Sequence, residues 1–188
     1  MESILRKEIV LNRSISRALV SIFFIIAISL GAFIRIQLPF TLVPLTMQTF
    51  FVLLSAAFLG VRLGLFTQFA YIFLGFIGLP IFTGTYAGGV YFIGPTAGYF
   101  FGFLAATIFI ARFIKYAKGN ILMITGIFCL ASILLLLCGV VWLKISLHLT
   151  WAKSLFFGFV PFLPGDIAKS ALAAFLFWKL KPRMKSIL

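Results

Sequence analysis

The sequence has few charged residues and little of what builds catalytic or metal centres. Lys, Arg, Asp and Glu make up 10% of its 188 residues, against ~25% in a typical soluble domain. Three acidic residues and one histidine are too few for a metal centre or an intramembrane aspartyl protease. Cys129 and Cys138 lie in one apolar run without metal or redox spacing. We therefore expect neither a soluble domain nor an enzyme, and no metal or cofactor.

Hydrophobic residues are abundant instead. They make up 63% of the chain, and the mean hydropathy is +1.22. These values indicate a polytopic membrane protein embedded in a lipid bilayer. The net charge of +13 does not indicate a nucleic-acid partner, because the basic residues flank the apolar runs instead of forming a patch. The sequence lacks the G-x-x-x-x-G-K-[ST] motif. Energy for any transport must therefore come from partner subunits or a gradient, if transport is energised at all.

Six apolar segments predict a single all-α transmembrane domain over residues 1–188. The predicted helices are residues 14–35, 46–59, 65–79, 95–113, 121–143 and 166–180. With six spans both termini lie on one side, and that side carries twelve of the Lys and Arg residues. The opposite side carries three, namely Arg35, Lys144 and Lys153. The positive-inside rule therefore predicts cytoplasmic termini.

Asp166 is the most informative single residue, because an ionisable side chain at membrane depth costs about 2.5–3.5 kcal/mol and usually faces a cavity or a partner. Pro161, Pro164 and Gly165 precede it, which predicts a break in the chain before the last helix. We expect Asp166 to cap this helix and to face a pocket, with Lys169 on the same helix face. The alternative is an ion pair that only neutralises itself.

Five segments, in this order along the chain, resemble the sequence motifs of a known family. They are LPFTLVPLTMQT from Leu38, GVRLG from Gly60, GLPIF from Gly78, GPTAGY from Gly94 and LPGDIAK from Leu163. Together they are similar to the BioY family, the biotin-specific substrate-capture (S) component of energy-coupling-factor (ECF) transporters. Val61 stands where the family usually has proline, and Ala97 replaces a glycine. The loop 83–91 contains no asparagine.

The resemblance implies a six-helix bundle of ECF S-component type that is not an enzyme. It further implies capture and uptake of biotin across the bacterial cytoplasmic membrane. The expected partners are a coupling transmembrane subunit and two ATPase subunits. Small residues on the first helix, which would dock the coupling subunit or else pack inside the bundle, are Ser14, Ala18, Ala27 and Gly31. The alternatives to biotin uptake are transport of another small vitamin and, less in keeping with the composition, a membrane enzyme.

The chemistry of biotin suggests roles for individual residues. A carboxylate at Asp166 can accept hydrogen bonds from the ureido N–H groups. Lys169 can donate to the ureido carbonyl or to the carboxylate tail, and the sequence leaves both open. Further candidate contacts, each of which could instead be a cap or a loop-folding residue, are Thr46, Gln48, Thr83, Thr85 and Tyr91. The sequence also leaves open whether the chain works alone, as an oligomer or within a complex.

Overall fold

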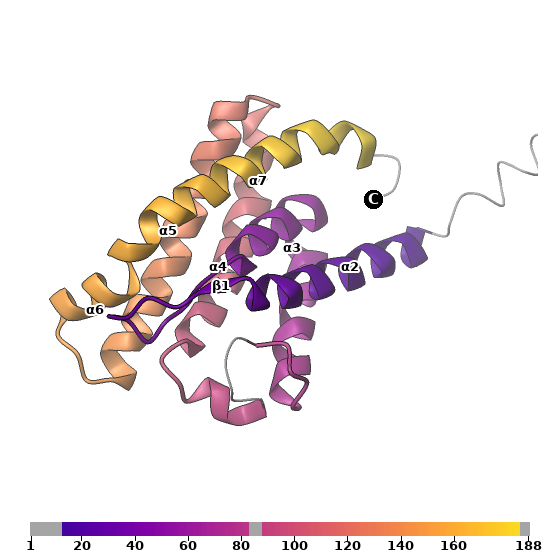
Figure 1. Ribbon diagram of the computed structural model, residues 1–188. Helices are drawn as coiled ribbons and strands as arrows, with labels where there is room; N and C mark the ends of the chain where they lie inside the picture. The colour runs from indigo at the N-terminus through magenta and orange to yellow at the C-terminus, as the bar shows by residue number, and fades with distance from the viewer. Residues whose placement is uncertain (1–12, 83–87, 185–188) are drawn as a thin grey trace, which may run out of the picture.

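The computed structural model describes residues 13–82 and 88–184, and this part of the chain is almost entirely helical (Figure 1). It contains 5 helical segments long and apolar enough to cross a membrane. The long helices are α2 (Arg13–Phe33), α3 (Gln48–Phe76), α4 (Ala97–Phe113), α5 (Ile121–Ser146) and α7 (Leu163–Met184). The short elements are β1 (Arg35–Ile36), β2 (Leu45–Thr46), η1 (Gly88–Phe92), η2 (Ile114–Ala117), α6 (Trp151–Gly158) and η3 (Val160–Phe162).

The predicted spans 46–59 and 65–79 are joined in α3. Gly60 interrupts this helix with φ of 71° and ψ of −169°, a conformation that glycine adopts without a steric penalty. The interruption divides α3 into two segments that run in different directions (Figure 1). The predicted turn at Gly60 is therefore present. The 5 spanning segments counted in the described part include α3 as one, and its two segments lie on either side of Gly60, as the predicted spans 46–59 and 65–79 do.

Glycines bring α4 and α5 into close contact. A Cβ atom added to Gly102 would lie 2.6 Å from the Leu135 carbonyl oxygen, and one added to Gly98 would overlap Trp142. On α5, a Cβ at Gly139 would overlap the ring of Tyr99. Small residues of this kind allow helices to pack closely in lipid, where the hydrophobic effect does not drive helix association.

Many large apolar side chains point away from the bundle. On α2 alone, the exposed ones are Ile15, Leu19, Ile22, Phe23, Ile26, Leu30 and Phe33. A soluble monomer rarely exposes so continuous an apolar surface. Together with the length and hydropathy of the spans, this surface shows a multi-pass membrane protein.

One end of the bundle is closed by the connection between α2 and α3. Its two short strands pair antiparallel, Arg35 with Thr46 and Ile36 with Leu45. The loop between them is tied to α6, because the Thr41 hydroxyl donates a 2.8 Å hydrogen bond to the Phe157 carbonyl. The first residues of α2 and the last residues of α7 lie at the opposite end of the bundle (Figure 1).

The start of the last helix differs from the prediction. Helix α7 begins at Leu163 and extends to Met184, so the predicted range 166–180 is too short at both ends. Pro164 lies in the first turn, where a missing N–H breaks no helical hydrogen bond. Asp166 is consequently inside the first turn and is not the N-cap residue. The irregular segment before α7 is the 3-10 turn η3, which contains Pro161.

Candidate functional site

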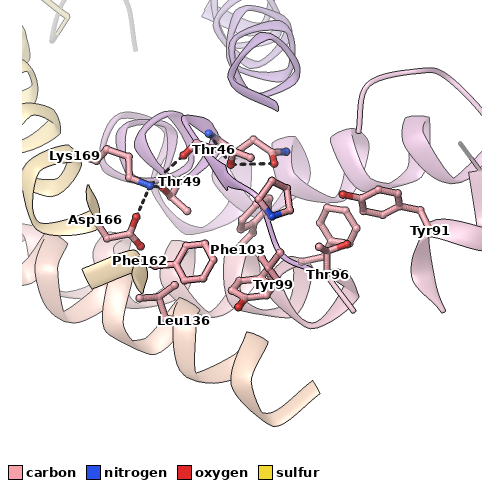
Figure 2. Close-up of a pocket in the computed structure, with 14 residues that line it drawn as sticks. Thr46, Thr49, Tyr91, Thr96, Tyr99, Phe103, Leu136, Phe162, Asp166 and Lys169 are labelled. Carbon is pink, nitrogen blue, oxygen red and sulfur yellow. Dashed lines mark hydrogen bonds and ion pairs between the residues drawn. The ribbon is translucent and has the colours of Figure 1, made fainter. Parts of the chain in front are cut away.

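A cavity lies between α3, α4, α5 and the first turn of α7, close to the end of the bundle that carries α6. The space between its lining atoms is about 490 Å³, a figure that includes the part open to the outside. Figure 2 shows the residues around it, which are Val43, Pro44, Thr46, Gln48, Thr49, Tyr91, Thr96, Tyr99, Phe100, Phe103, Leu136, Phe162, Asp166 and Lys169.

Asp166 and Lys169 form a buried ion pair in the cavity wall. They are 3% and 7% exposed, and their i,i+3 spacing on α7 brings the two groups together. Ser132 on α5 donates a 2.9 Å hydrogen bond to Asp166 Oδ2. Asp166 Oδ1 pairs with the Lys169 ammonium. A carboxylate has about four acceptor positions, so this one keeps acceptor capacity for a ligand.

Lys169 is more fully engaged than its partner. Its ammonium donates to the Thr46 carbonyl at 3.0 Å and to the Thr49 hydroxyl at 2.7 Å, and it pairs with Asp166 (Figure 2). These three contacts match the three N–H donors of an ammonium group. A ligand can therefore hydrogen-bond to Lys169 only by replacing one of them. The polar centre of the cavity consequently offers mainly an acceptor, which is Asp166.

Three other predicted contact residues line the same cavity. Thr46 and Gln48 lie where β2 meets α3, and the Thr46 hydroxyl donates to Gln48 Oε1 at 3.3 Å. Tyr91, in η1, lies on the opposite side of the cavity from Asp166 and Lys169 (Figure 2). Thr83 and Thr85 lie outside the described residues. The structure thus brings together predicted contact residues from three separate segments of the chain.

No group of His, Cys, Asp and Glu residues able to hold a metal ion occurs among residues 13–82 and 88–184.

The family model described as "BioY family" matches residues 6–186, which is nearly the whole chain. The chain belongs to the BioY family. The predicted membership is confirmed by this match.

Relatives and a solved structure agree with that assignment. The chain is 36% identical over 160 residues to "Biotin transporter BioY" of Thermotoga maritima, covering 84% of this chain and 91% of the relative. It is 35% identical over 150 residues to "Biotin transporter BioY2" of Lactococcus lactis, covering 77% and 82%. The crystal structure of "the S-component for biotin from an ECF-type ABC transporter" superposes with a TM-score of 0.84 at 26% identity, covering 93% of this chain and 95% of that one. These BioY relatives are transport components, not enzymes.

Several cavity residues of this BioY chain were not selected from the sequence. Thr49 is the most important of them, because it hydrogen-bonds to Lys169. Ser132 does not line the cavity, but it hydrogen-bonds to Asp166 from α5. Thr49 belongs to the first segment that resembles the family, so that motif contained a usable signal. Ser132 lies in a helix without a motif, and only the packing of α5 on α7 reveals it. The apolar wall of the cavity could not be identified from the sequence, because the chain contains 25 phenylalanines. This wall is formed by Tyr99, Phe100, Phe103, Leu136 and Phe162.

The small residues of α2 occupy two different environments in this BioY chain. Ala27 is buried, and a Cβ added to Gly31 would lie 3.0 Å from the Met47 carbonyl carbon and 3.1 Å from the Gln48 nitrogen. These two residues pack inside the bundle, as the alternative interpretation had it, and are not available for docking. Ala18 is exposed. The side chain of Ser14 lies outside what the structure describes.

Proposed function

We propose that this chain captures biotin in the Asp166 cavity and takes part in its uptake as the substrate-binding subunit of an ECF transporter. The observation that carries the proposal is the buried Asp166 carboxylate, whose contacts with Lys169 and Ser132 leave acceptor positions beside an aromatic wall. The ureido group of biotin presents two N–H donors, and its fused rings are otherwise apolar. The acceptor suits the donors, and the wall formed by Tyr99, Phe100 and Phe103 suits the rings. The relatives named as biotin transporters support the same ligand.

Equilibrium binding of labelled biotin to the purified, detergent-solubilised protein tests this function. We expect saturable binding that dethiobiotin competes for, because dethiobiotin keeps the ureido ring. Thiamine, which has no ureido group, is the negative competitor. If thiamine displaced the label as well as dethiobiotin did, or if no saturable binding were found, the proposed ligand would be wrong.

Partner subunits follow from the same proposal. The chain lacks a phosphate-binding loop, so two ATPase subunits and a coupling transmembrane subunit would supply the energy. The exposed apolar face of α2 around Ala18 is the surface that we assign to the coupling subunit. A small residue at its centre allows another helix to approach closely.

Replacing Ala18 with tryptophan is expected to abolish most biotin uptake in cells that contain the complete transporter, while equilibrium biotin binding stays unchanged. The indole group would hold the coupling subunit away from α2, although the cavity is not touched. Ala27→Trp is the matched control. Because Ala27 is buried, this variant should lose folded protein and binding together. Normal uptake by the Ala18 variant would show that the coupling subunit docks elsewhere.

We further propose that the protein lies in the bacterial cytoplasmic membrane with both termini in the cytoplasm. The described basic residues support this orientation, because Arg17, Arg112 and Lys115 lie toward the end of the bundle opposite α6, whereas Lys153 lies on α6. The cavity, which is near the α6 end, would then open to the exterior.

Single cysteines at positions 115 and 153, in a background without Cys129 and Cys138, are expected to label from opposite sides of the membrane. Lys115 and Lys153 are both exposed, so a membrane-impermeant thiol reagent should reach position 153 in intact cells and position 115 only after permeabilisation. Labelling of both positions in intact cells would contradict the proposed orientation.

A further inference from the structure

Tyr71 is a completely buried tyrosine that does not line the cavity but contacts a residue that does. It lies on the second segment of α3 with 0% of its surface exposed. Its hydroxyl oxygen accepts a 2.6 Å hydrogen bond from Gln48 Nε2 and donates a 3.1 Å hydrogen bond to the Ile81 carbonyl. Through Tyr71, a cavity residue is thus connected to the backbone that follows α3.

The direction of these bonds fixes the orientation of the Gln48 amide. A backbone carbonyl can only accept, and a tyrosine hydroxyl has one proton. That proton is therefore committed to Ile81, and the hydroxyl oxygen can only accept from Gln48. The amide must turn its NH₂ group toward Tyr71. Its oxygen then lies beside the Thr46 hydroxyl, which donates to it at 3.3 Å in the cavity wall.

Tyr71 is itself held in place by aromatic packing. Its ring makes edge contacts with Phe82 and Phe100 at centroid distances of 5.5 and 6.4 Å. A Cβ atom at Gly75 would overlap the ring of Phe82, so Phe82 can occupy this position only because residue 75 is glycine. The position of the Ile81 carbonyl next to Phe82 is thereby fixed, and with it the direction in which the Tyr71 proton points.

We propose that Tyr71 is a specificity-determining positioning residue, which holds the Gln48 amide with its oxygen toward the ligand. This inference rests on the proposed function and deepens it. Gln48 would supply a second acceptor besides Asp166, and two acceptors match the two N–H donors of a cyclic urea. A ligand that presents an acceptor or a methyl group at the Gln48 position would be rejected. The ligand class is therefore a ring with two N–H groups flanking a carbonyl.

The test compares biotin with its two ureido mono-N-methyl analogues on the wild type, Tyr71→Phe, Gln48→Met and the double variant. Phenylalanine keeps the ring packing but removes the group that orients the amide. We expect Tyr71→Phe to weaken biotin binding by about 5- to 30-fold. We also expect it to reduce the rejection of one methyl analogue, and Gln48→Met to reduce the rejection of that same analogue. In the Gln48→Met background, Tyr71→Phe should have no further effect on binding.

Three results would overturn the inference. The first is wild-type affinity and selectivity in Tyr71→Phe. The second is an equal loss of affinity from Tyr71→Phe in both backgrounds, which would indicate a merely structural role. The third is unchanged selectivity in Gln48→Met, a result that decides the question even if Tyr71→Phe does not fold. Failure of the wild type to bind biotin would instead overturn the proposed function, so the two failures are distinguishable.

Discussion

Replacing Asp166 with asparagine is expected to weaken biotin binding by about 30- to 1,000-fold. The variant loses a charge-assisted hydrogen bond to the ligand, and the new amide donor can face a ureido N–H. The combined cost is roughly 2–4 kcal/mol, since an unpaired buried donor adds to the lost bond, and 1.4 kcal/mol is a factor of ten in affinity. Titration of labelled biotin against the purified variant measures the effect.

Ser132→Ala is the matched control for this variant. It removes the 2.9 Å hydrogen bond to Asp166 Oδ2 but keeps the carboxylate and its charge. Because Ser132 does not line the cavity, the loss of affinity should stay at or below about tenfold, which is about 1.4 kcal/mol. Both variants should remain folded, because Lys169 keeps its contacts with Thr46 and Thr49. Wild-type affinity in folded Asp166→Asn would remove Asp166 from the site.

Replacing Gly102 with alanine is expected to destabilise the bundle by about 1–3 kcal/mol or more. The added methyl group would lie 2.6 Å from the Leu135 carbonyl oxygen and 2.9 Å from its Cα. Both atoms belong to the backbone of α5, so no side-chain rotation can relieve the overlap and the two helices must separate. The midpoint of thermal aggregation in detergent, followed by size-exclusion chromatography, measures the loss.

Gly126→Ala provides the control, because it makes the same chemical change in a helix interior. A Cβ atom at Gly126 would meet nothing within 4 Å. Alanine is favoured over glycine in a helix by about 1 kcal/mol, so this variant should be as stable as the wild type or more stable. If the two variants behaved alike, the close approach of α4 and α5 would not contribute to stability.

Sequence alone predicted the parts of the fold that depend on hydropathy. The helix predicted at 121–143 appears as α5, Ile121–Ser146, because an uninterrupted apolar run leaves no other solution in lipid. The boundaries that failed involve proline and glycine. Pro164 was interpreted as a break although the first turn of a helix accepts proline, so the predicted start at 166 is too late. Gly60 does separate two helical segments, but helical geometry resumes directly after it, earlier than the predicted start at 65.

The site was predictable where an unusual residue marked it. Asp166 and Lys169 were found because charges in an apolar span are rare, and their i,i+3 spacing predicted the pair. Their partners were not predictable, because Thr49 lies 120 residues from Lys169 in the sequence. Tyr71 also had no signal in the sequence, since its role depends on the directions of hydrogen bonds that only the assembled helices define.

The spacing of the Asp166–Lys169 pair also bears on how the protein is made. The last helix must enter the membrane with two ionisable side chains, each of which would cost about 2.5–3.5 kcal/mol at the centre of a lone helix. Because both charges lie on the same turn of α7, they can neutralise each other before any other helix arrives. A lone α7 therefore carries less unpaired charge into the bilayer than it would if the two residues lay on different turns.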